Sequence, residues 1–112
     1  MAAPLEKVDQ IHTEAGLVRG WIQASVEKLT ALGKTQDVPE LSWVGLILET
    51  VTHAADRIDQ LAKDWRQAND VMPIGVGMIM RGQLHQTMNA DLAVMRKAKE
   101  VVGEVMTDFG LL

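Results

Sequence analysis

The apolar residues of this chain recur every three or four positions, and that spacing constrains its fold more than any other feature. Such periodicity is typical of helices that bury one face, whereas a half-buried strand alternates every second residue. No alternating pattern lasts for more than a few residues. We therefore predict an all-α protein. The clearest stripe lies in the second third of the chain, at Val44, Ile47, Val51, Ala54, Ile58, Leu61, Trp65 and Ala68.

Two segments rich in turn-forming residues divide the chain. They lie at 33–39 and 69–73, and each contains a proline. Proline disfavours a helical residue before it but is tolerated at the first helical position. The chain of 112 residues has room for a single domain, 1–112. We predict an up-down-up bundle with helices over about 5–32, 40–68 and 74–108.

The predicted helices are long for so short a chain. At about 1.5 Å per residue they would measure roughly 40–50 Å. Three such rods make an elongated bundle that buries a small share of its surface. We therefore expect oligomerisation to complete the core, either with further copies of this chain or with a helix of a partner protein.

An apolar segment, 71–80, opens the third predicted helix. A helix that is apolar on every side must be covered by something, and methionine side chains adapt readily to a partner surface. We predict a contact with a second copy or a partner protein. The alternative is that the segment tucks beneath the other two helices. The residues of the predicted contact are Met72, Ile74, Val76, Met78, Ile79 and Met80.

The first predicted helix carries a second unusual face. Gly16 and Gly20 are spaced by four, opposite the apolar stripe of the same helix. Glycine destabilises a helix by about 1 kcal/mol relative to alanine, so we interpret this pair as a close contact with another helix. The alternative is a loosened helix at a tolerant site. Trp21 and Trp43 lie at the borders of apolar stripes, where they either seal a subunit interface or pack in the core.

Asp91 lies in the middle of the apolar stripe of the third predicted helix. A buried carboxylate is unfavourable unless it is paired, and a buried polar residue can fix helix register or oligomeric state. We predict that Asp91 is buried, with Arg57, Arg81 or a residue of another subunit as its partner. The alternatives are a bundle that splays and exposes Asp91, or a catalytic carboxylate.

The sequence shows no pattern of residues that would carry catalysis. It contains no Ser-His-Asp arrangement, no H-E-x-x-H and no P-loop. The absence of cysteine excludes a thiol nucleophile and a cysteine-based zinc site. Glu49, His53 and Asp56 share one helix face, but metal-binding bundles draw ligands from several helices. We therefore predict no enzymatic activity, no cofactor and no metal.

The charge balance bears on partners and location. Lys and Arg total 11 and Asp and Glu total 15, which gives a net charge of −4. This lacks the basic footprint of a phosphate-backbone binder, so nucleic acid is not expected as a partner. No apolar run approaches the roughly 20 residues that span a bilayer, and no signal peptide is visible. We expect a cytoplasmic protein or a component of a larger assembly.

Trp43-Val44-Gly45 is a W-x-G triplet in an acidic, cysteine-free and helical chain. In this the chain resembles the WXG100 proteins, helical hairpins that dimerise and are exported by type VII secretion. The resemblance implies a secreted helical partner protein. The chain departs from the family pattern by its third helix, by a triplet inside the predicted second helix rather than at a turn, and by the lack of tyrosine for the family's C-terminal Tyr-x-x-x-Asp/Glu signal.

These observations together predict a non-enzymatic interaction or assembly protein. It would dock helix faces to itself or to a partner protein, as an adaptor, a structural component or an inhibitor. One alternative is a helical bundle that binds a small ligand or a metal around Asp91 or the histidines. A further alternative is a WXG100-like secreted partner.

Overall fold

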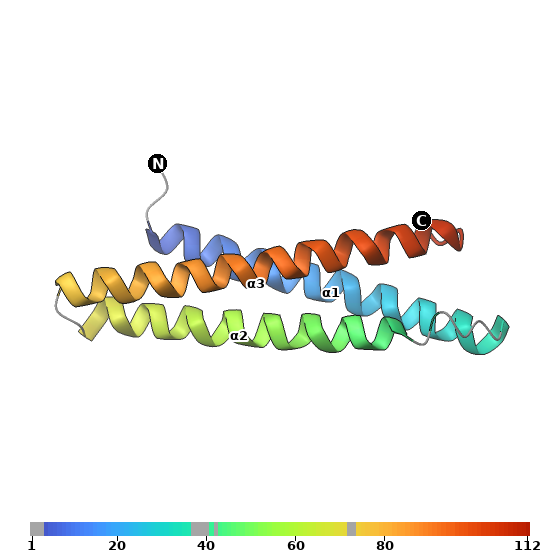
Figure 1. The fold of residues 1–112 in the computed structure, drawn as a ribbon, viewed down its shortest axis with the longest axis horizontal. Coiled ribbons are helices and arrows are strands. Elements are labelled where there is room, and N and C mark those ends of the chain that lie inside the picture. Colours follow the sequence, from blue (N-terminus) through green and yellow to red (C-terminus); the bar gives the residue numbers. More distant parts are fainter. Residues whose placement is uncertain (1–3, 37–40, 42, 72–73) are drawn as a thin grey trace.

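Three long helices make up the protein (Figure 1). The computed structural model describes residues 4–36, 41, 43–71 and 74–112. α1 runs over Pro4–Gln36, α2 over Val44–Val71 and α3 over Ile74–Asp108. α1 and α3 point the same way, and α2 runs antiparallel to both. The predicted all-α, up-down-up bundle is confirmed for the described part of the chain.

The helix boundaries differ from the prediction at both turns, and α2 ends at Val71 rather than near 68. α1 continues through Gly33 to Gln36 instead of ending near 32. α2 begins at Val44 rather than near 40, directly after Leu41 and Trp43, which have 3-10 geometry. A single glycine destabilises a helix by about 1 kcal/mol, and packing of the neighbouring Leu29 and Leu32 on the core offsets it. The third helix has the predicted boundaries.

The new start of α2 changes the position of the W-x-G triplet. Trp43 precedes α2, and Val44 and Gly45 open it. The prediction that the triplet lies inside the second helix is therefore wrong. It lies at the junction of the α1–α2 connection with α2.

A continuous strip of apolar side chains runs through the bundle, to which all three helices contribute. The molecule measures 58 × 24 × 15 Å, so this strip is long and thin. Trp65, expected in the core, is buried there. Within the described ranges, no helix combines the length and apolar character needed to cross a membrane. The largest fully buried side chains are Ile22, Leu29, Ile58, Met88, Leu92 and Met95.

The end of α3 is closed by a Schellman motif. The amide of Leu111 donates to the carbonyl of Met106 at 2.8 Å, and that of Gly110 to Thr107 at 3.0 Å. Gly110 has a φ of 69°, the left-handed conformation that this motif needs and that glycine adopts without strain. The motif turns Leu111 back against the core.

The burial pattern predicts different responses of two isoleucines to truncation. Ile58 is fully buried and Ile79 is 66% exposed. We expect Ile58→Ala to lower the free energy of unfolding by about 2–5 kcal/mol, and Ile79→Ala to change it by less than about 0.5 kcal/mol. Urea denaturation of dilute protein measures both. Equal losses would contradict the assigned rotation of α2 and α3.

Candidate docking surface

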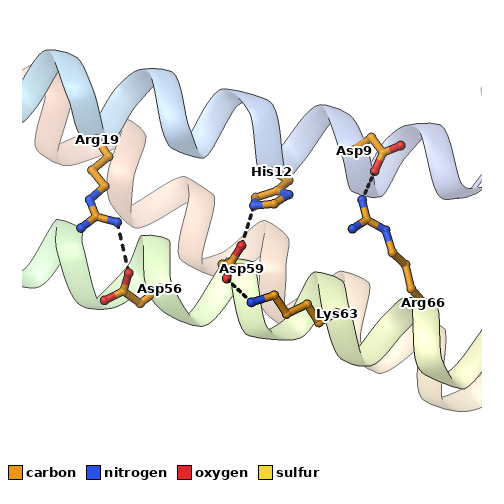
Figure 2. A network of polar contacts seen from close by, with 7 residues as sticks. All are labelled: Asp9, His12, Arg19, Asp56, Asp59, Lys63 and Arg66. Atoms are coloured by element: carbon orange, nitrogen blue, oxygen red, sulfur yellow. Dashed lines mark hydrogen bonds and ion pairs between the residues drawn. The ribbon is translucent and has the colours of Figure 1, made fainter.

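The outward face of α2 is charged. Several of its side chains reach across to α1 (Figure 2). Arg66 lies 2.6 Å from Asp9, and Arg19 lies 3.1 Å from Asp56. The ionisable residues exposed on the described part of α2 are Glu49, His53, Asp56, Arg57, Lys63, Arg66 and Asp70. This face is typical of a helix surface that stays in water.

Two carboxylates that form hydrogen bonds with a neighbouring helix, Glu14 and Asp59, have lowered pKa values. A hydrogen bond from Lys63 lowers the pKa of Asp59, and His12 adds to the effect from 2.9 Å. Hydrogen bonds from Arg96 lower the pKa of Glu14. The same hydrogen bonds connect α3 to α1. Exposed ion pairs add little stability. Their consequence here is that charged groups of α1 point sideways, toward the neighbouring helices.

The outward face of α3 contains no charged side chain over five turns. Between Gly75 and Met95 the ionisable residues are Arg81, His85 and Asp91, and none of them is exposed. Six of the exposed positions in this stretch follow steps of three and four. We call them the α3 seam: Val76, Ile79, Gln83, Gln86, Ala90 and Val94. Ile79 is 66% exposed and Val76 is 55% exposed. This spacing is that of a coiled-coil contact face.

A shorter uncharged face lies on α1. Between Gln10 and Val26 the ionisable residues are His12, Glu14 and Arg19, and each is partly buried and paired. The exposed residues that we call the α1 face are Thr13, Gly16, Leu17, Gly20 and Ala24. Leu17 is 70% exposed.

The glycines of the α1 face make no close contact within the molecule. A side chain placed on Gly16 or Gly20 would meet no atom within 4 Å. Gly16 and Leu17 instead border a shallow depression on the surface, together with His12 and Thr13. The glycines therefore leave α1 accessible to close approach from outside.

The structure leaves three of the residues predicted to form a contact in segment 71–80 exposed. Val76, Met78 and Ile79 are exposed, so the alternative that they tuck beneath the other helices is wrong. Met80 is half-buried. Met72 and the side chain of Ile74 lie outside the described residues.

The two tryptophans at the stripe borders, Trp21 and Trp43, differ in how far they are exposed to solvent. Trp21 is half-buried and packs against the core, with Lys99 Nζ 5.5 Å from the centre of its ring. Trp43 is 37% exposed. Trp21 therefore belongs mainly to the bundle itself, whereas Trp43 presents part of its ring to solvent.

Asp91 is buried, and Arg57 is its partner. Arg57 Nε and Nη2 donate to the two carboxylate oxygens of Asp91, each at 2.6 Å. Hydrogen bonding to Asp91 raises the pKa of the Arg57 guanidinium. The alternative that the bundle splays and exposes Asp91 is wrong. The pair fixes the rotation of α3 against α2, with the neighbouring Ala90 facing outward.

A small depression lies near the end of the bundle where α3 begins. Its volume is about 310 Å³, and its lining includes Trp65, Met78 and Gly82. The ionisable lining residues are all basic: Lys7, Arg81 and His85. The Arg81 guanidinium lies 5.7 Å from the centre of the Trp65 ring. Across the residues that the structure describes, no three His, Asp or Glu side chains are placed to hold a metal ion.

The fold and surface together define an elongated three-helix bundle in which α1 and α3 each carry an uncharged outward stretch and α2 carries a charged outward face. Comparisons with protein-family models, with curated proteins and with solved structures find no match.

The structure also shows an exposed uncharged face that sequence reasoning missed. The prediction stopped at residue 80, whereas the exposed uncharged face continues through Gln83, Gln86 and Ala90 to Val94. The signal was present in the sequence as the absence of charge at these positions. It could be recognised only after the outward side of the helix was known.

Arg57→Ala would leave the buried Asp91 carboxylate without its partner. We expect the thermal midpoint to fall by several degrees, because a buried unpaired charge is strongly unfavourable. Adding Asp91→Leu to this variant should recover most of the loss. Arg66→Ala, which breaks an exposed pair, serves as the control and should change the midpoint little. An equal effect of Arg57→Ala and Arg66→Ala would contradict a structural role for the buried pair.

The lowered pKa values of Glu14 and Asp59 predict acid sensitivity. Because folding lowers them from ordinary values of 4.5 and 3.8, their stabilisation is present above those values and is lost as pH falls through the lowered ones. We expect the thermal midpoint to fall between about pH 5 and about pH 3. Glu14→Gln should flatten part of this dependence, whereas Glu104→Gln on α3 should not. An unchanged slope in Glu14→Gln would refute the assignment.

Proposed function

We propose that this protein is a non-enzymatic interaction or assembly protein that docks helix faces to a second copy or to a partner protein. One observation carries the proposal: α1 between Gln10 and Val26 and α3 between Gly75 and Met95 expose no charged side chain, while α2 exposes charged residues from Glu49 to Asp70. In the same molecule, α2 provides the comparison for a face that remains in solvent.

The physical reason lies in desolvation. Removing charged side chains from water is unfavourable unless each finds a partner, whereas alanine, valine and isoleucine gain from burial. The centres of protein interfaces are accordingly depleted in charge. Ile79, Val76 and Leu17, each more than half exposed, have the largest gain available. These faces supply contact area and present no cluster of reactive groups.

Absolute mass, measured by light scattering after size exclusion across a range of concentrations, tests self-association. We expect a mass above that of the 12.3 kDa monomer. Ile79→Asp should return the protein to the monomer without loss of helicity, because it places a charge at the proposed contact. Gln67→Asp adds the same charge to the outward face of α2 and is the matched control.

Two outcomes decide the proposal. Oligomers lost in Ile79→Asp but kept in Gln67→Asp would support it. If the wild-type chain is a monomer at every concentration, a pull-down is the second arm, with Ile79→Asp as its control. The proposal would be contradicted by a chain that is monomeric and that captures, in the pull-down, no protein whose binding is lost in Ile79→Asp.

The depression beside Trp65 supports a second candidate, the binding of a small anionic ligand. Its basic lining of Lys7, Arg81 and His85 favours a negatively charged group, and Trp65 supplies an apolar wall. Native mass spectrometry of the purified protein tests this candidate. A retained small molecule that is lost in Lys7→Ala would support it, and bare protein alone would count against it.

A further inference from the structure

The residues of the α3 seam are arranged nearly symmetrically about its midpoint. About the midpoint between Gln83 and Gln86, Ile79 and Ala90 lie at equal distances, and Val76 and Val94 lie at distances that differ by one residue. All six residues are exposed and lie on the outward side of one helix. Turned by half a revolution about this midpoint, the seam would bring Val76 to within about one residue, or about 1.5 Å along the helix, of Val94 of a second copy, and Ile79 level with its Ala90.

We propose that the α3 seam binds the α3 seam of a second copy, antiparallel, about a two-fold axis that passes between Gln83 and Gln86. This inference rests on the proposed docking function and names its partner. A two-fold dimer brings the same patch of both subunits together, which is the commonest symmetry of soluble homo-oligomers.

The antiparallel pairing matches side chains by size and by hydrogen bonding. It sets Ile79 beside the partner's Ala90, a large residue against a small one, which lets the helices approach. At the axis it sets Gln83 beside the partner's Gln86, and each amide both donates and accepts hydrogen bonds. A parallel pairing would instead oppose Ile79 to the partner's Ile79 and leave a gap between the two Ala90 residues.

The extent of the seam sets the strength of the dimer. The seam spans about 27 Å along α3 and is one helix wide. This strip is smaller than the roughly 800 Å² per partner of a standard interface. We therefore expect a reversible dimer whose population rises with concentration, not a permanent one.

Cysteine cross-linking tests the geometry, and the chain contains no cysteine of its own. In the proposed dimer, Val76 lies beside the partner's Val94. The two copies of Val76 are about 25 Å apart along the direction of the helices. A disulfide needs Cα atoms within about 7 Å. We therefore expect oxidation of a mixture of Val76→Cys and Val94→Cys to give a disulfide dimer. Either variant oxidised alone should give no more disulfide dimer than Gln67→Cys, the control on α2.

Isotope labelling of one variant lets mass spectrometry distinguish mixed from self-paired dimers. Circular dichroism checks that each variant is folded. An excess of the mixed dimer by several-fold over the control supports the inference. Self-pairing of Val76→Cys would show a parallel arrangement and overturn it.

The remaining outcomes separate this inference from the proposed function. An oligomer in light scattering without the mixed disulfide would mean that another face associates, which overturns the α3 seam dimer and leaves helix docking intact. A monomer without any specific disulfide, and without a partner sensitive to Ile79→Asp, overturns both.

Discussion

The rotation of each helix about its own axis is the constraint on which this structure depends. The apolar strip of the core sets it, because every helix must turn its stripe inward to remove apolar surface from water. The Asp91–Arg57 pair adds a directional contact between α2 and α3. Two hydrogen bonds to a carboxylate that is 5% exposed leave little freedom for α3 to roll. This rotation determines which residues of each helix face outward.

Once the rotation is fixed, α1 and α3 are each left with an uncharged stretch facing outward. The polar contacts in Figure 2 lie along the line where α1 meets α2, and they occupy the charged side chains of both helices there. Between Gln10 and Val26, and between Gly75 and Met95, α1 and α3 expose only uncharged residues. A bundle that acted alone in water would gain nothing from leaving Ile79 and Leu17 exposed. This distribution of charge links the packing of the core to the proposed role in assembly.

The sequence was sufficient for the architecture because its signals are local and repeated. Periodicity over many turns defines helices such as α2, and Pro73 marks the α2–α3 connection. The end of α1 was placed too early, because the packing of Leu29 and Leu32 outweighs the weak helix preference of Gly33. The burial of Asp91 could be predicted from its position in a stripe, but the choice between Arg57 and Arg81 required the relative placement of two helices. The α3 seam beyond residue 80 depended on the same placement.

Amide NMR spectra recorded during dilution would test the central claim most directly, because they report on each residue of the wild-type chain. The account predicts concentration-dependent shifts along the exposed side of α3 from Val76 to Val94, with the outward face of α2 from Glu49 to Arg66 unchanged. Shifts that are concentrated on α2, or spread evenly over all three helices, would contradict the claim that the uncharged faces are the docking surfaces.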